Sequence, residues 1–352
     1  SYHQNAPIGN VKMNMKLKKI AATATTIALF SSAAFADTVL TMNSWLPPTH
    51  PQVAELFVPW AADIEKVTEG RVKINILPAP LGPPPAAFDL AKNGIADITY
   101  SVHGYTPGRF KTSVLGEMPF LSDDAVATSV AFWRVQDAML KDAGEYDGVK
   151  VLTVFTHGPG EIFSRKPIET AEDVSGQKIR IGSTMAHDIA TNLGAVPVEG
   201  PSSKAYELLS QGVADGIFFP FETVTFFSLE DILDYGYTVK GGLYNSAMFV
   251  VMNEAKWNSI SAEDQALIEP LLGEAFARRA GEMWNAADAK GRAEMEGKIT
   301  IKAASDEEVA ALKTRLAPIV EERIAQITEA GVDGQAAYDM MLSEIAKIES
   351  EK

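Results

Sequence analysis

The 352-residue chain contains no cysteine and no apolar run as long as the roughly 20 residues that a membrane-spanning helix requires. The lack of cysteine excludes disulfides, thiolate nucleophiles and cysteine-based zinc sites. Basic residues are also scarce, because 31 Lys and Arg face 46 Asp and Glu. We therefore expect no nucleic-acid partner and no stable insertion of the mature chain into a membrane.

The usual catalytic signatures are missing as well. The sequence has no Gly-x-Ser-x-Gly, no His-Glu-x-x-His and no phosphate-cradling glycine loop. We expect no enzymatic activity, no catalytic residue, no bound metal and no cofactor. A three-histidine metal site built from His50, His103 and His157 is a weaker alternative, since their spacing gives it no direct support.

The N-terminus has the pattern of a targeting segment. Lys16, Lys18 and Lys19 precede an apolar stretch at 20–30, and Ala34-Phe35-Ala36 fits a signal-peptidase site. We interpret residues 1–36 as an upstream remnant (1–12) and a signal peptide, and predict a periplasmic location. The alternative is an amphipathic helix that the mature protein keeps. The predicted mature chain has 27 basic and 46 acidic residues, a net charge of −19.

Short apolar strands alternate with amphipathic helices through the predicted mature chain. The patterns predict strands at 38–44, 72–76, 96–102, 149–156, 177–181, 196–198, 215–219 and 247–253. They predict helices at 52–68, 86–93, 124–143, 184–193, 204–211, 261–297 and 306–351. This βαβαβ rhythm predicts an α/β fold with mixed sheets flanked by helices.

The predicted helix at 261–297 would be about 50 Å long at 1.5 Å per residue. That length exceeds one small domain, so we expect it to span two lobes, as in a ligand-binding protein that closes by a hinge. We assign 37–157 plus about 245–285 to lobe I. Lobe II takes 158–244 plus about 286–330, and 331–352 forms a charged C-terminal helix.

One charge stands inside an apolar run. Arg180 lies within the predicted strand at 177–181, and its sequence neighbours supply no acid. A buried guanidinium is costly unless it meets a partner. That partner is either a distant Asp or Glu of the protein or an anionic ligand.

Several segments in order resemble the solute-binding proteins of tripartite ATP-independent periplasmic (TRAP) transporters, of the dicarboxylate-receptor type. The resemblance covers about 37–330. Its segments are Thr68-Glu-Gly-Arg-Val-Lys-Ile74, Leu81-Gly82, Asn93-Gly-Ile-Ala-Asp97, Glu117-Met-Pro-Phe-Leu121, Lys166-Pro-Ile168, Asp173-x-x-Gly176-x-Lys178-Ile-Arg180, Gly194-Ala195-x-Pro197 and Gly212-Val-Ala-Asp-Gly216. The resemblance implies a two-lobed periplasmic-binding-protein fold and a receptor that delivers a small organic anion to TRAP membrane permease subunits.

In that family the arginine of the Lys-x-Arg motif pairs with the ligand carboxylate, and here it is Arg180. A planar guanidinium suits this role because it binds a carboxylate at two points. The chain departs from the sialic-acid-binding branch at several polar contacts. Gly160 stands at a second arginine, Phe219 and Ser183 at asparagines, and Phe218 and Val102 at glutamates.

Apolar pockets select ligands with apolar bodies, so we expect a monocarboxylate with an aromatic or branched body. A keto acid, a dicarboxylate or a small sulfonate stays open. The predicted ligand-binding residues are Arg180, Phe219, Trp45, Ser183, His157, His103, Phe218, Tyr105, Tyr244 and Asn43. Two other functions remain as alternatives, namely an exported enzyme acting on an organic acid and a ligand sensor for a membrane receptor.

Overall fold

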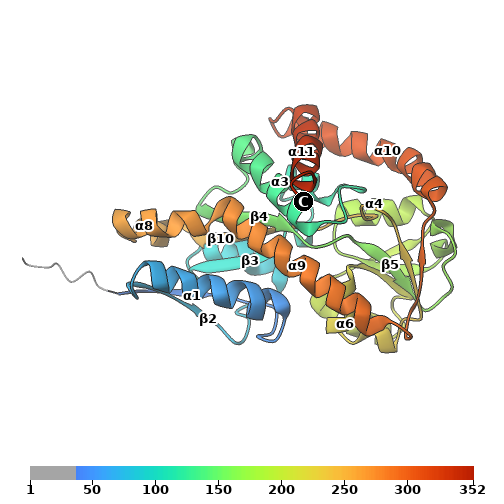
Figure 1. The fold of residues 1–352 in the computed structure, drawn as a ribbon, viewed down its shortest axis with the longest axis horizontal. Coiled ribbons are helices and arrows are strands. Elements are labelled where there is room, and N and C mark those ends of the chain that lie inside the picture. Colours follow the sequence, from blue (N-terminus) through green and yellow to red (C-terminus); the bar gives the residue numbers. More distant parts are fainter. Residues whose placement is uncertain (1–36) are drawn as a thin grey trace, which may run out of the picture. The chain divides into compact units, whose positions relative to one another are not determined.

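The computed structural model describes residues 37–352 (Figure 1). The predicted signal peptide and upstream remnant, 1–36, lie outside the described residues. Two mixed β-sheets form the body of residues 37–352, as predicted for an α/β fold. No helix within this range combines the length and apolarity needed to cross a bilayer.

The first sheet has five strands in the order β2-β1-β3-β10-β4. β10 runs antiparallel to both of its neighbours, and the other pairs are parallel. The chain therefore returns to this sheet after building five of the six strands of the second one. The strands are β1 (Thr38–Met42), β2 (Val72–Ile76), β3 (Ile98–Val102), β4 (Val149–Thr156) and β10 (Ala247–Asn253).

The second sheet has six strands in the order β11-β9-β5-β8-β6-β7. β5 is antiparallel to its two neighbours, whereas β6 is parallel to β7 and β8. The strands are β5 (Glu161–Ser164), β6 (Lys178–Ile181), β7 (Val196–Glu199), β8 (Gly216–Phe219), β9 (Tyr235–Thr238) and β11 (Thr300–Ala303). The sequence patterns missed β5, β9 and β11.

Helices cover both sheets. Up to residue 226 they are a π-helical turn (Gln52–Phe57), α1 (Val58–Val67), α2 (Ala87–Lys92), α3 (Ala125–Ala138), α4 (Thr184–Asn192), α5 (Ala205–Ser210) and α6 (Phe221–Phe226). Later come α7 (Glu254–Asn258), α8 (Ala262–Ile268), α9 (Gly273–Met295), α10 (Asp306–Glu329) and α11 (Gly334–Glu349). Short 3₁₀ turns, among them His103–Tyr105, connect several of these elements.

The single helix predicted at 261–297 is wrong in detail, because the chain breaks between α8 and α9. Pro270 lacks a backbone N–H and sits in a 3₁₀ turn, and Gly273 has a φ of +58°. The remaining α9 has 23 residues, or about 35 Å. It packs against α3 and β4 at one end and α6 at the other, so it still joins the two sheets (Figure 1).

The C-terminal helix α11 is amphipathic rather than fully solvated. Ala337, Met341 and Ile345 are buried, and Glu344 forms an ion pair with Arg134 of α3 at 2.7 Å. The helix packs against α3, which itself lies on β4 of the first sheet. The C-terminal segment therefore extends the core around the first sheet.

Candidate ligand-binding site

Arg180 lies in the middle of β6 and is 3% exposed. Its neighbours Ile179 and Ile181 enter the hydrophobic core, so the alternation of the strand directs Arg180 to the other face. Nε donates to the Gly200 carbonyl at 2.8 Å, and Nη1 donates to the Phe218 carbonyl at 3.3 Å. Among residues 37–352, no Asp or Glu pairs with this guanidinium. Its charge is therefore only partly compensated by the protein.

The guanidinium opens into a cavity that lies between the ends of the two sheets. Elements far apart in the sequence contribute to its wall, chiefly the loops after β1, β3 and β4 and the strand β8. Six predicted residues line this cavity: Trp45, Tyr105, His157, Arg180, Phe219 and Tyr244. The carboxyl ends of strands in open α/β sheets are the usual place for a ligand.

The aromatic side chains of the cavity are held in place from outside it. Trp45 donates its indole N–H to the Tyr100 carbonyl at 2.9 Å, which fixes the ring. Tyr105 packs edge-on against Trp45, with 5.9 Å between ring centroids. The Phe219 ring lies under the guanidinium of Arg180, 4.6 Å from its central carbon. A charged group and apolar faces therefore meet in one cavity, as recognition of an aromatic anion requires.

His157 follows β4 and is neutral at physiological pH. Burial lowers its pKa to about 4, and the nearby charge of Arg180 adds to this effect. Its Nδ1–H donates to the Gly158 carbonyl. The other ring nitrogen, Nε2, is then a hydrogen-bond acceptor. His157 therefore adds no positive charge to the cavity.

Four predicted residues lie outside the cavity wall. His103 packs against Phe110 and Phe249 and bonds to the Tyr146 hydroxyl. Phe218 is fully buried behind the cavity and stacks on Tyr244. Ser183 caps α4, and Asn43 accepts a hydrogen bond from the Leu81 backbone. Each of these four side chains therefore has a structural partner.

The ring of Tyr244 occupies the space next to Gly160, the position of a second ligand arginine in the sialic-acid branch. A Cβ atom on Gly160 would lie 2.2 Å from this ring. Gly160 and Tyr244 also form a backbone bridge between the segment that leads from β4 to β5 and the segment that leads from β9 to β10. A second arginine at this position is therefore incompatible with Tyr244 in its present place.

The cavity wall also contains polar residues that the sequence did not single out as ligand contacts. They come from the π-helical turn, from α6, from the start of β10 and from α9: Gln52, Thr223, Ser246 and Trp284. His50, a member of the alternative three-histidine site and a candidate neighbour of Arg180, lines the cavity too. Nothing in the local pattern of these residues marks them, since each lies in a segment with ordinary helix or loop character.

The three-histidine alternative finds no support in the described chain. His103 is enclosed by aromatic rings, whereas His50 faces Glu222, with 2.9 Å between Nε2 and Oε1. Within residues 37–352, no three His, Asp or Glu side chains are grouped so that they could hold a metal ion.

Asp288, on α9 beside the cavity, carries a pH-dependent contribution to stability. Burial raises its pKa to about 8, although the Glu222 backbone N–H bonds to it at 2.9 Å. Between about pH 4 and pH 8 the folded state keeps a proton that the unfolded state loses, so stability falls as the pH rises. From pH 5 to pH 8 the free energy of unfolding of the parent should fall by up to roughly 4 kcal/mol more than that of the Asp288→Asn variant. Urea unfolding of both proteins at the two pH values measures this, and parallel pH profiles would contradict it.

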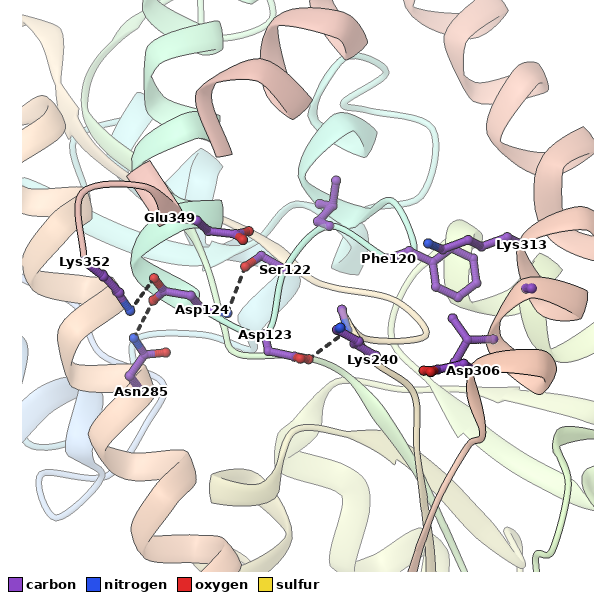
Figure 2. Close-up of a pocket in the computed structure, with 14 residues that line it drawn as sticks. Phe120, Ser122, Asp123, Asp124, Lys240, Asn285, Asp306, Lys313, Glu349 and Lys352 are labelled. Carbon is purple, nitrogen blue, oxygen red and sulfur yellow. Dashed lines mark hydrogen bonds and ion pairs between the residues drawn. The ribbon is translucent and has the colours of Figure 1, made fainter. Parts of the chain in front are cut away.

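A wider pocket lies where α9, α10 and α11 approach the loops at 120–124 and 240–241 (Figure 2). One carboxylate of this pocket already has partners, since Lys352 Nζ lies 2.6 Å from Asp124 Oδ2 and Asn285 donates to Asp124 at 2.7 Å (Figure 2). All three of its lysines are exposed. The Arg180 cavity, with its buried charge, is therefore the stronger candidate for an anion site.

Comparisons with known proteins show the family of the chain. A sequence model of the family described as "Bacterial extracellular solute-binding protein, family 7" matches residues 42–326. The "Outer membrane transporter protein TsaT" of Comamonas testosteroni is 30% identical over 340 residues, 94% of this chain and 99% of that one.

Two solved structures of TRAP solute-binding proteins share the fold. One, from Bordetella bronchiseptica with bound (R)- and (S)-mandelate, has a TM-score of 0.86 and 37% identity, covering 88% of this chain and 99% of that one. The other, from a marine metagenome with 3-hydroxybenzoate, has a TM-score of 0.83 and 31% identity, covering 89% and 99%. With its two-lobed fold and its match over most of its length, the chain belongs to the family 7 extracellular solute-binding proteins of TRAP transporters.

Proposed function

We propose that this chain is a periplasmic receptor that captures a small aromatic monocarboxylate and delivers it, chemically unchanged, to TRAP membrane permease subunits. The observation that carries the proposal is the buried guanidinium of Arg180, which no carboxylate of residues 37–352 neutralises and which opens into an aromatic-walled cavity. The ligand carboxylate would take the place of that missing partner.

The ligand class follows from the charge and shape of the cavity wall. Arg180 is the one Lys or Arg among its lining residues, which favours one carboxylate rather than two. Trp45, Phe219 and Tyr244 offer ring surfaces that a planar apolar body can contact. Two related TRAP proteins bind aromatic acids, mandelate in one case and 3-hydroxybenzoate in the other. A polyhydroxylated sugar acid would leave hydroxyl groups unpaired against these rings.

Capture would involve closure of two lobes around the ligand. We assign 37–157 plus about 245–285 to lobe I and 158–244 plus about 286–330 to lobe II. The division is supported by the two sheets, because the chain crosses between them at 157–160 and 239–246. The residues 158–160, Gly-Pro-Gly, then lie at one crossover. Hinge motion at such crossovers is the usual way in which two-lobed receptors close.

A thermal-shift and calorimetric comparison tests the ligand class. Benzoate, mandelate and 3-hydroxybenzoate should each raise the melting temperature, whereas glucuronate, N-acetylneuraminate and succinate should not. At 100 times its dissociation constant, a ligand adds about 2.7 kcal/mol to the stability of the folded state. Benzamide, which keeps the ring but has no charge, is the matched control and should give no shift.

Two results would overturn the proposal. The first is a larger stabilisation by a sugar acid than by any aromatic acid. The second is chemical conversion of the aromatic acid, seen by chromatography after incubation with the protein, which would favour the exported-enzyme alternative.

A further inference from the structure

A second polar group in the cavity has no hydrogen-bond partner within residues 37–352. Gln52, the first residue of the π-helical turn, is 1% exposed and lines the cavity. Neither its side-chain oxygen nor its side-chain nitrogen bonds to any group within residues 37–352. The indole N–H of Trp284, also in the cavity wall and 4% exposed, likewise has no partner in this part of the chain. Buried polar groups in native proteins are nearly always hydrogen-bonded, so these atoms require a partner from elsewhere.

The π-helical turn that carries Gln52 has a local cause. Pro59 lacks the N–H that would continue the regular helical bonds back from α1, and the Val58 N–H bonds instead to the Val53 carbonyl, five residues earlier. At the start of this turn, the Gln52 backbone N–H donates to His50 Nδ1 at 3.0 Å. The position of Gln52 is thus set by the backbone and does not depend on its own amide group.

The hydrogen bonds around Gln52 also fix the state of its neighbours. His50 Nδ1 accepts this hydrogen bond, and its Nε2 faces Glu222 Oε1 at 2.9 Å. The Thr223 hydroxyl donates to the other carboxylate oxygen of Glu222 at 2.9 Å. The oxygen of Thr223, which lines the cavity, can therefore still accept a hydrogen bond.

A run of rings connects this end of the cavity with Arg180. The guanidinium lies over Phe219, whose ring is stacked 6.3 Å from Phe227. Phe227 contacts Phe226 at 5.1 Å, and Phe226 lies 4.5 Å from the His50 ring. Phe219, Phe227 and the His50 ring line the cavity, whereas Phe226 packs on the last two from outside its wall. Aromatic surface therefore extends from the cationic end toward the Gln52 end, as a ligand with one charged and one polar group would require.

The charge near Gln52 selects the kind of polar group. The Glu222 carboxylate lies directly behind His50 and Thr223, and no Lys or Arg belongs to the cavity wall besides Arg180. A second carboxylate or a sulfonate here would meet like charge without a compensating cation. A neutral hydroxyl can donate to Gln52 Oε1 or Thr223 Oγ1 and accept from Gln52 Nε2 or Trp284 Nε1.

We propose that Gln52, with Thr223 and Trp284, forms a second subsite that recognises a hydroxyl group carried by the aromatic ring at a position remote from the carboxylate. This inference rests on the proposed function, and it narrows the ligand class to hydroxylated aromatic monocarboxylates. Gln52 is then a specificity-determining residue. Gln52 then favours binding of these ligands over unsubstituted aromatic acids, which would leave its side-chain amide without a hydrogen bond. It also favours them over aromatic dicarboxylates, which would bring a second negative charge.

Calorimetric titration of the parent protein and of Gln52→Met with benzoate, 3-hydroxybenzoate, 4-hydroxybenzoate and terephthalate tests the subsite. The parent should bind at least one hydroxybenzoate about 10- to 100-fold more tightly than benzoate, and terephthalate more weakly than either. In Gln52→Met the preference for the hydroxyl should vanish, while benzoate binds as well as in the parent or better. The affinity of the variant for benzoate reports its folding, and Thr223→Val provides a second variant that should reduce the same preference.

Gln136→Met is a matched control, because Gln136 on α3 is also a buried glutamine with an unpartnered side-chain oxygen but lies outside the cavity wall. Gln136→Met should leave the ratio of the affinities for hydroxybenzoate and benzoate unchanged. If Gln52→Met keeps the parent's ratio, the subsite is refuted while the aromatic-acid receptor stands. Failure of the parent to bind any aromatic carboxylate would refute both proposals.

Discussion

Substitution of Arg180 by alanine is expected to abolish aromatic-acid binding at micromolar protein concentrations. Removing one member of a buried, hydrogen-bonded charge pair typically costs about 2–5 kcal/mol, or about 30- to 5,000-fold in dissociation constant. We expect a loss of affinity at the upper end of this range, because the cavity wall contains no other Lys or Arg that could bind the ligand carboxylate. Isothermal titration with benzoate measures the change.

A lysine variant separates the contribution of the positive charge from that of the planar guanidinium, which can bind two carboxylate oxygens. Arg180→Lys keeps a positive charge but cannot reach both the Gly200 carbonyl and two ligand oxygens at once. We expect an affinity between those of the parent and the alanine variant. Arg165→Ala is the matched control, since Arg165 also bonds to backbone carbonyls, those of Leu209 and Ala214, but lies outside the cavity wall. If a folded Arg180→Ala protein binds benzoate as tightly as the parent, the proposed site is refuted.

Regular patterns made part of the fold predictable. β2, β4 and β10 occupy the predicted ranges, because each is an alternating or continuous apolar run bounded by residues that break it. The missed elements have only four to six residues. α6 is instructive, since its sequence of aromatic and β-branched residues is typical of a strand. It forms a helix that starts after Pro220 and packs on α9, so tertiary packing overrides local preference.

The candidate site likewise contains residues that the sequence predicts and residues that it does not. Arg180 could be found from sequence because a charge in an apolar strand is costly and because a family motif contains it. Trp45, Tyr105 and His157 could be anticipated because they follow strands, and the carboxyl ends of strands meet at one edge. Gln52 and Trp284 could not, because their segments look like ordinary helices. Only the approach of the π-helical turn, α6 and α9 in three dimensions brings them to the cavity.

The second large effect is expected at Gly104, where segments that follow strands of the two sheets touch beside the cavity. Gly104 follows β3 of the first sheet, and a Cβ atom added to it would lie 2.6 Å from the Ser183 Cβ and 2.8 Å from the Gly182 carbonyl oxygen, just after β6 of the second. Beside it, the Tyr105 hydroxyl accepts a hydrogen bond from the Ser202 backbone at 2.9 Å. These contacts hold the cavity closed between the two lobes that we propose.

Gly104→Ala should therefore weaken ligand binding without harming the fold of either lobe. The added methyl group can be accommodated if the lobes separate, at a cost of about 1–3 kcal/mol, typical of overpacking, or about 5- to 150-fold in affinity. Titration with benzoate measures the loss, and small-angle scattering should show that saturating ligand compacts the parent more than the variant. Gly82→Ala is the control, because a Cβ there would meet only Ala86 and Leu90 at ordinary contact distances. If Gly104→Ala binds and compacts like the parent, the contact between Gly104 and Ser183 has no part in closure, and the ligand must be held by an arrangement in which these two residues lie apart.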